Sequence, residues 1–235
     1  MKMNTSKILT LSALLAGSAL NAASITWTAG TFDNAGPASV LNADNLVYAA
    51  NLGGADLTVD VSGTNVLFEA TPLGGAVTGE GVYVTNASGA QAFTDAYWTG
   101  GDANWDSIND TGIFRFSGTN ALQVTLQGLT DGQEYQVQLF ASDDTNSGNR
   151  SSFYSDAATA GNISSELRMG DKDYVVGAFI ASGTTQDIFV QTGNIGVAYL
   201  DGLSLTTLTS IPEPGSYALI GGLLALGSVM LHRRR

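Results

Sequence analysis

A polar, glycine-rich stretch between residues 93 and 106 holds the side chains with the most evident chemistry. Tyr97, Trp98 and Trp105 are large rings within it, and the stretch lacks the alternation of a β-strand. Rings on loops can stack on the faces of sugars, while carboxylates and amides bind the hydroxyl groups. Arg150, in a later polar connection, is a further candidate for contact with a sugar. We expect a loop that binds a neutral glycan or, alternatively, rings that fill one end of the core.

The same stretch contains a possible calcium loop. Asp102, Asn104 and Asp106 follow the D-x-N-x-D spacing, which places three oxygen ligands on one turn. The EF-hand pattern then requires Gly and, at its twelfth position, Glu, but the chain has Ser107 and Ile113 there. The alternatives are therefore a looser structural calcium site or ordinary Asp and Asn caps of turns.

The composition excludes several classes of chemistry. The chain of 235 residues has no cysteine, and its one histidine, His232, lies near the C-terminus. A thiolate nucleophile, a Ser-His-Asp triad and a Cys- or His-ligated zinc site are therefore excluded from the central part. The formal net charge of −12 repels phosphate backbones, so we expect no binding to nucleic acid.

Glycoside hydrolysis would need two carboxylates on either side of the bond that is cleaved. Glu69 is the exceptional glutamate within an apolar run, and we expect it to face water at the end of a strand. We therefore expect no catalytic residues, and a carbohydrate-active enzyme is the least favoured alternative.

The elements that must position these residues are β-strands. Leu122, Val124 and Leu126 alternate with polar residues, which is typical of a half-buried strand. Asp131-Gly132 then predicts a tight hairpin turn, because Gly accepts a positive φ. The expected strands are residues 25–28, 46–50, 57–61, 66–69, 82–84, 113–116, 121–127, 135–140, 174–180, 188–191 and 197–205.

So many short strands, with 29 glycines and only 4 prolines, predict an all-β fold. We expect an antiparallel β-sandwich, and a jelly roll in preference to an immunoglobulin-like arrangement. No tandem repeat or internal linker divides it. The predicted domains are a signal peptide (1–23), the sandwich (24–205), a linker (206–211) and a C-terminal signal (212–235).

The N-terminus predicts export. Lys2 and Lys7 precede an apolar run over residues 8–20, and small residues follow. This order is typical of a secretory signal peptide, with cleavage expected after Ala22 or Ala23. The partner implied is the Sec export machinery.

The C-terminus holds a Pro-Glu-Pro triplet, an apolar run over residues 217–231 and a basic end. As a helix the run is about 22 Å long at ~1.5 Å per residue, which is short for a membrane span. The basic end would remain in the cytoplasm. The residues concerned are Pro212, Glu213, Pro214, Arg233, Arg234 and Arg235.

These three parts, in this order, closely resemble the PEP-CTERM sorting signal of Gram-negative bacteria. The resemblance implies an exosortase as partner, which processes the tail at the inner membrane and sends the protein to the cell surface or extracellular matrix. It also implies a setting rich in exopolysaccharide and biofilm. The alternative is an ordinary membrane anchor that is never processed.

The central part carries a second resemblance. Residues 128–140 read GLTDGQEYQVQLF, residues 174–186 read YVVGAFIASGTTQ, and residues 198–205 read AYLDGLSL. This pattern of turns and core positions resembles the galactose-binding-like or malectin-like jelly-roll modules of secreted bacterial proteins. It supports the fold more than the function. We therefore expect a non-enzymatic surface protein that binds or organises extracellular polysaccharide; the alternative is a self-associating structural protein without a glycan site.

Overall fold

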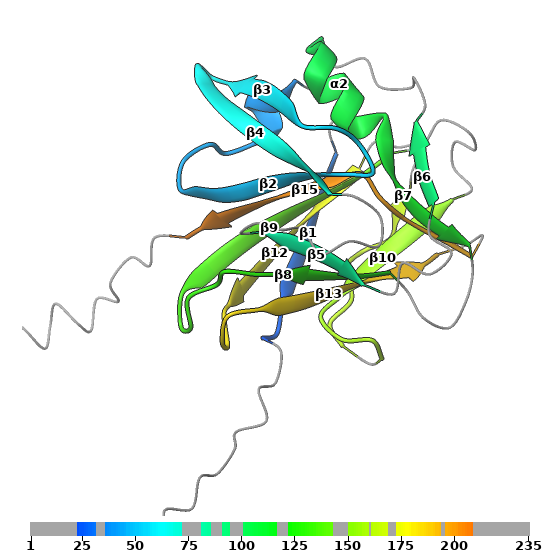
Figure 1. Ribbon diagram of the computed structural model, residues 1–235. Coiled ribbons are helices and arrows are strands. Elements are labelled where there is room, and N and C mark those ends of the chain that lie inside the picture. Colours follow the sequence, from blue (N-terminus) through cyan, green and yellow to red (C-terminus); the bar gives the residue numbers. More distant parts are fainter. Residues whose placement is uncertain are drawn as a thin grey trace, which may run out of the picture.

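Three β-sheets and two short helices make up the part of the chain that the computed structural model describes (Figure 1). This part covers residues 23–31, 36–71, 81–85, 91–94, 101–116, 122–142, 150–159, 161–168, 173–193 and 196–208. The predicted signal peptide up to residue 22 and the predicted sorting signal from residue 212 lie outside it. Within the described residues, no helix has the length and apolar character needed to span a membrane.

The largest sheet has seven strands. In spatial order they are β1 (Thr26–Thr31), β12 (Asp173–Ile180), β9 (Glu134–Ala141), β15 (Gly202–Thr207), β2 (Leu46–Leu52), β4 (Thr64–Thr71) and β3 (Leu57–Val61). The five-stranded sheet has the order β11 (Leu167–Arg168), β10 (Ser151–Ser155), β13 (Gln186–Thr192), β8 (Leu122–Leu126) and β5 (Val82–Thr85). The third sheet comprises β14 (Val197–Leu200), β7 (Thr111–Phe116) and β6 (Gln91–Thr94).

The main core lies between the seven-stranded and the five-stranded sheet. Val137 and Leu139 of β9 enter it from one side, and Val124 and Ile188 of the other sheet enter it from the opposite side. Because side chains alternate along a strand, the intervening residues of β9 point to the outer face of the seven-stranded sheet. The predicted all-β fold is confirmed.

Part of that outer face is covered by the helices α1 (Pro37–Val40) and α2 (Ala103–Asn109). A second apolar cluster lies there, in which Phe68, Trp105, Ile108 and Phe140 are fully buried. The rest of the outer face, over β9, β12 and β15, is largely polar and only partly covered, because Gln138, Ser204 and Thr206 are each less than 10% exposed there. The sheet therefore has one apolar half and one polar half on the same side.

The longest expected strand, 197–205, is wrong as a single element. It breaks at Asp201, where the chain passes from the three-stranded sheet into the seven-stranded one. The backbone N–H of Asp201 donates to the carbonyl of Phe140 at 2.9 Å, and its carbonyl accepts from Leu52 at 2.8 Å. Its buried carboxylate accepts from the backbone N–H of Ser142. These contacts fix the corner, and hydrophobic alternation carries no sign of them.

Two further expectations need correction. Gly132 has a φ of 76°, and Gln133 closes the predicted turn by donating to the Thr130 carbonyl at 3.0 Å. The turn nevertheless joins β8 to β9 in different sheets, so it is not a hairpin. In addition, β2 and β4 pair in parallel within a sheet expected to be antiparallel throughout. The elements that the sequence did not predict are β6, β10, β11, α1 and α2.

Candidate functional site

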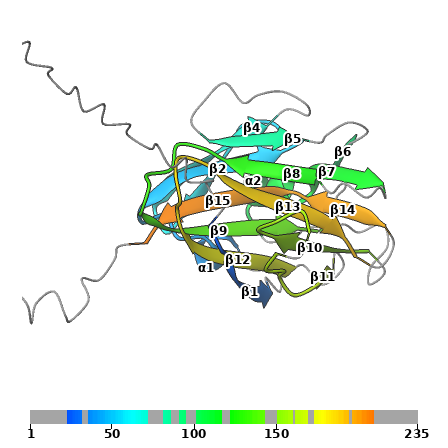
Figure 2. The ribbon, with the colours of Figure 1, turned by 90° about the horizontal axis from the view of Figure 1, so that it is seen from below.

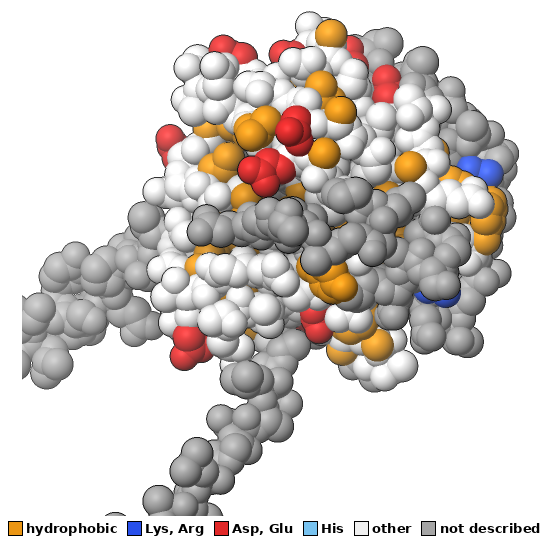
Figure 3. Space-filling view, in the orientation of Figure 1, with side chains coloured by type: hydrophobic (Ala, Val, Ile, Leu, Met, Phe, Trp, Pro, Cys, Tyr) orange, Lys and Arg blue, Asp and Glu red, His pale blue; other side chains and the backbone are white. Residues whose placement is uncertain are grey.

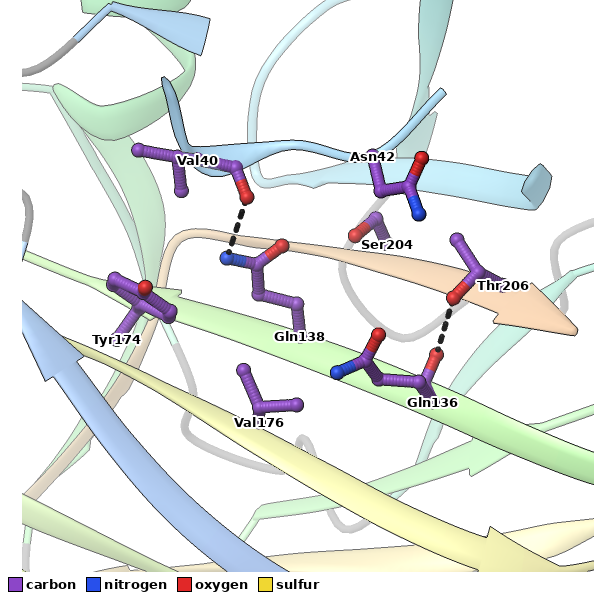
Figure 4. A pocket seen from close by; sticks show the side chains of 8 residues that line it. All are labelled: Val40, Asn42, Gln136, Gln138, Tyr174, Val176, Ser204 and Thr206. Atoms are coloured by element: carbon purple, nitrogen blue, oxygen red, sulfur yellow. Dashed lines mark hydrogen bonds between the residues drawn. The ribbon is translucent and has the colours of Figure 1, made fainter. Parts of the chain in front are cut away.

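The candidate site is a groove on the polar half of the outer face, with a volume of about 180 Å³ (Figure 4). Strands β9, β12 and β15 form its floor, and the end of α1 with the residues after it forms its rim. It is lined by Val40, Asn42, Gln136, Gln138, Tyr174, Val176, Ser204 and Thr206.

The strand register assembles the floor of the groove. Gln138 lies opposite Val176 of β12 on one side and Ser204 of β15 on the other, so these three side chains form one row across the sheet. Gln136 lies opposite Thr206 and belongs to the next row. All of these residues point outward because their neighbours along the strands fill the main core.

Tyr174 supplies an aromatic wall to the groove (Figure 4). The residue is half-buried, and its ring lies against Gly30 of the neighbouring strand β1. A Cβ on Gly30 would lie only 2.3 Å from a ring carbon of Tyr174. Glycine is therefore the residue that lets the ring take this place, and a larger residue would displace it.

Hydrogen bonds fix the groove's shape and leave polar groups for a ligand. The Gln138 side-chain amide donates to the Val40 carbonyl at 3.2 Å, and the Thr206 hydroxyl donates to the Gln136 carbonyl at 3.4 Å (Figure 4). By contrast, no hydrogen bond to other described residues is recorded for the Gln136 amide group or the Ser204 hydroxyl. A ligand can bond to these groups without breaking a contact of the fold.

The groove's lining has no charged side chain. Amides and hydroxyls donate and accept equally well, which suits a ligand that is rich in hydroxyl groups and carries no charge. Acidic side chains are scattered over the described surface in the view of Figure 3, while basic ones appear only at one side of it. An anionic ligand would therefore be repelled by the chain's formal charge of −12. The volume lies below the roughly 300–1,000 Å³ of pockets for drug-sized ligands.

Trp105 does not lie at a glycan-binding surface. Its ring is fully buried beneath α2, with its centroid 5.3 Å from that of Phe140 and 6.1 Å from that of Phe68. A buried ring has no face for a sugar to stack on, so Trp105 does not act as a stacking platform in this structure. The alternative, a ring that fills the core, describes its place. Tyr97 and Trp98 lie outside the described residues.

Asp102, Asn104 and Asp106 belong to the start of α2 and do not form a calcium loop. The Asp102 carboxylate caps the helix by accepting from the backbone N–H groups of Asn104 at 3.0 Å and Trp105 at 2.8 Å. The Asn104 side chain donates to the Thr58 carbonyl of β3 at 2.7 Å. Consecutive residues of a helix turn by about 100°, so Asn104 points away from the other two. The capping alternative fits this arrangement.

Arg150 lies away from the groove, against the third sheet. Its guanidinium carbon is 5.6 Å from the centre of the Tyr199 ring, and it donates a hydrogen bond to the Tyr199 hydroxyl. The Tyr199 ring stacks on Phe114 at 5.8 Å. Arg150 is therefore a cation over an aromatic cluster, and the structure does not bring it together with the groove.

Of the predicted processing residues, Ala23 is described and Ala22 is not. The Ala23 backbone N–H donates to the Gln186 side chain at 2.9 Å. Pro212, Glu213, Pro214 and the three terminal arginines lie outside the described residues. The residues of the groove were not singled out by the sequence analysis. The signal was the polar side of the alternating strand at residues 135–140, where Gln136 and Gln138 lie.

Comparison with known proteins adds little to this geometry. No protein-family model matches the sequence, and no curated protein matches it. The ANXUR1 extracellular domain from Arabidopsis thaliana superposes with a TM-score of 0.41 at 12% identity, over 70% of this chain and 49% of that chain. This chain therefore spans about half the length of that plant protein.

Two bacterial xylan-related structures are similarly distant. The CBM22-1 xylan-binding domain from Paenibacillus barcinonensis Xyn10C gives a TM-score of 0.41 at 9% identity, over 73% of this chain and 99% of that chain. The CBM22-1-GH10 modules of Clostridium thermocellum xylanase 10B with xylohexaose give 0.34 at 14%, over 71% and 29%. At these TM-scores the likenesses carry no argument about function, and the groove itself must carry it.

Proposed function

We propose that this protein is an exported, non-enzymatic β-sandwich of the jelly-roll type that binds uncharged polysaccharide outside the cell. The groove over β9, β12 and β15 is the observation that carries the proposal. It combines one aromatic wall, Tyr174, with uncharged hydrogen-bonding groups at Gln136 and Ser204. A sugar ring has the same two-sided character, with an apolar face and a rim of hydroxyl groups.

A ligand in the groove would stack one sugar face against the half-buried Tyr174 ring. Its hydroxyl groups would then bond to the Gln136 amide and the Ser204 hydroxyl, which lie on neighbouring rows of the floor. The small volume fits a single ring of a longer chain, with the rest of the chain running across the open side of the sheet. Tyr97, Trp98 and Arg150 remain proposed as further contacts to a long chain.

The decisive experiment is equilibrium binding of the full chain to purified exopolysaccharide of the producing bacterium. Dextran serves as an uncharged probe and alginate as an acidic one. We expect Tyr174→Ala to weaken binding to the uncharged probes about tenfold or more, since tenfold corresponds to ~1.4 kcal/mol. Tyr83→Ala, at a half-buried tyrosine of the five-stranded sheet, is the matched control and should bind normally. Equal binding by both variants would contradict the groove assignment.

Export and sorting form the second part of the proposal. The apolar run behind Lys2 and Lys7 supports removal of a leader after Ala22 or Ala23, and the tail supports processing by exosortase. Replacing Pro212, Glu213 and Pro214 with alanine should leave the protein in the inner membrane, measured by fractionation of the producing cells. Unchanged release of that variant would contradict processing, whatever the groove binds.

A further inference from the structure

Strand β1 is an edge of the seven-stranded sheet, and its outer side is contacted near its start, where the Trp27 Nε1–H donates to the Asn162 carbonyl at 3.1 Å. It lies beyond β12 at the rim of the molecule and pairs with no other described strand (Figure 2). Its sequence, TWTAGT, has no charge and no proline, and its six pairs with β12 run without a bulge. Natural edge strands are normally blunted by charge, proline, a bulge or a cover, because an open edge recruits another strand.

The other edges in the described part of the chain are managed in these ways. β3 carries Asp60, and both helices pack against it. β11 has only two residues, one of them Arg168, while β5, β6 and β14 have four each. The six uncharged residues of β1 are therefore an exception that needs a reason.

The contacts of Ile25 show which backbone groups of β1 point outward. Its N–H donates to the Asp156 carboxylate at 2.9 Å, and its carbonyl accepts from the Asn162 side chain at 3.3 Å. These groups are therefore directed away from β12. Backbone groups alternate in direction along a strand, so those of Trp27 and Ala29 are also directed outward. No hydrogen bond between these outward groups and other described residues is recorded.

We propose that β1 pairs antiparallel with β1 of a second copy of this chain about a two-fold axis. Outward groups must meet outward groups, and in the register that we propose Trp27 of each copy exchanges hydrogen bonds with Ala29 of the other. This register places Thr28 directly opposite its own counterpart, in the close, non-hydrogen-bonded type of pair. Threonine pairs of this kind are favourable across strands.

A second copy fits this edge better than an unrelated peptide. A foreign strand gains its specificity from pockets that receive alternate side chains. On the outer face, Gly30 of β1 is already covered by the Tyr174 ring, and the groove begins over the neighbouring strand β12. An isologous pair needs no pockets, because the same surface is used twice. A contact of about five residues is small, so the dimer should be weak and concentration-dependent.

The two-fold axis of an antiparallel pair is perpendicular to the sheet, so both grooves would face the same side. The two β12 strands would lie three strand spacings apart, about 14 Å at ~4.8 Å each. This consequence rests on the proposed function: one dimer would hold two polysaccharide segments or two sites of one chain, with a gain in avidity.

The test uses sedimentation equilibrium of the full chain in mild detergent, without glycan, for wild type, Thr28→Lys and Thr28→Glu. Like charges opposite each other should lower the association constant of each variant about tenfold or more. An equimolar mixture of the two variants should restore association, because the charges across the axis are then opposite. Thr58→Lys, on the exposed side of the β3 edge, is the matched control and should associate like wild type.

Circular dichroism of each variant checks that it is folded. A wild-type chain that stays monomeric at every concentration overturns the proposal, and so do Thr28 variants that associate normally. Loss of association that the mixture fails to restore also overturns it, because the partner of β1 is then a different surface. Binding to dextran at low concentration is measured in parallel, so failure of the dimer leaves the groove assignment independently tested.

Discussion

On the outer face of the seven-stranded sheet, an apolar half that stabilises the fold lies beside a polar half that forms the candidate groove. Phe140 and Gln138 are two residues apart on β9 and point to the same side. Phe140 is buried against Trp105 under α2, whereas Gln138 contributes to the floor of an open groove. A single strand thus passes from an apolar surface under α2 to a largely polar surface at the groove within one pleat. The side-chain pattern, rather than the backbone, decides which half a helix covers.

The free energy of burial explains why a helix covers only the apolar half. Each large apolar side chain contributes roughly 1.5–3 kcal/mol when it is buried, so the apolar half gains from a helical cover. Covering the amides and hydroxyls of the other half without partners would cost free energy instead. Gln136 therefore remains half-exposed to water or to a ligand, while Ser204 lines the groove as a nearly buried residue. The comparison makes four predictions, from the largest expected effect to the smallest.

Trp105→Ala should damage the covered half most. The ring is fully buried between Phe68 and Phe140, and removing it leaves a cavity under α2. We expect the free energy of unfolding to fall by about 3–5 kcal/mol, measured by urea denaturation. Trp105→Phe, which keeps a ring in the cluster, should lose less. A near-neutral Trp105→Ala would mean that the covered half contributes little to stability.

The second prediction concerns Tyr154 in the main core, which should make the free energy of unfolding depend on alkaline pH. Burial first, and the Asp201 carboxylate second, raise the pKa of Tyr154 well above its ordinary value. The folded protein keeps this phenol protonated where the unfolded chain, with a pKa near ~10, has ionised. Its stabilising contribution is therefore complete below pH ~10 and declines above it, by ~1.4 kcal/mol per pH unit.

This second prediction is checked by thermal unfolding across alkaline pH together with tyrosinate absorbance. Tyr154→Phe should lower stability near neutral pH, because the hydroxyl donates to the Tyr199 carbonyl at 3.0 Å. In Tyr154→Phe the free energy of unfolding should fall less steeply at alkaline pH than in wild type, because the phenol with the raised pKa is gone. An unchanged slope would show that other groups cause the alkaline unfolding.

The start of α2 gives the third prediction. Asp102→Ala removes the cap of the covering helix and should cost about 1 kcal/mol of unfolding free energy. The loss should be equal in EDTA and in calcium, because the carboxylate acts on backbone N–H groups. Asp102→Asn should recover most of it. A loss that appears only in calcium would restore the interpretation of Asp102, Asn104 and Asp106 as ion ligands.

Local pattern predicted the strands well but not their order in space. Alternation at Leu122–Leu126 and around Val137 predicts the inner face of each sheet, because burial on one side imposes period two. It carries no information on the sheet to which a strand belongs, so the corner at Asp201 was missed. Helix α2 had a signal in its Asp102 cap and in the buried Trp105 and Ile108, one turn apart. Its short, asparagine-rich sequence read as a loop.

The candidate site was harder to predict than the fold. Rings in a polar stretch seemed to offer a sugar platform, yet Trp105 is buried because α2 turns it inward. The groove is built from residues far apart in the sequence, such as Gln136, Tyr174 and Ser204, and only the strand register brings them together. A polar residue on the outer side of a strand looks the same whether it faces bulk water or a cavity.

The fourth prediction has the smallest expected change in stability. It tests the comparison by replacing a polar side chain of the groove with an apolar one. Gln136→Leu keeps a side chain of similar size in the groove. It removes an amide for which no hydrogen bond to other described residues is found. We expect the free energy of unfolding to change by no more than about 0.5 kcal/mol, because the residue is half-exposed and holds no described partner through its amide.

Binding to dextran should nevertheless weaken several-fold in Gln136→Leu, because a sugar hydroxyl loses its partner in the groove. Gln123→Leu, at a half-buried glutamine of β8 in the other sheet, is the matched control for both measurements. If Gln136→Leu stabilised the fold and left binding intact, the polar half would be incompletely covered core rather than a ligand site. If binding fell at constant stability, the two halves would be separable, with folding assigned to the helix-covered side and recognition to the groove.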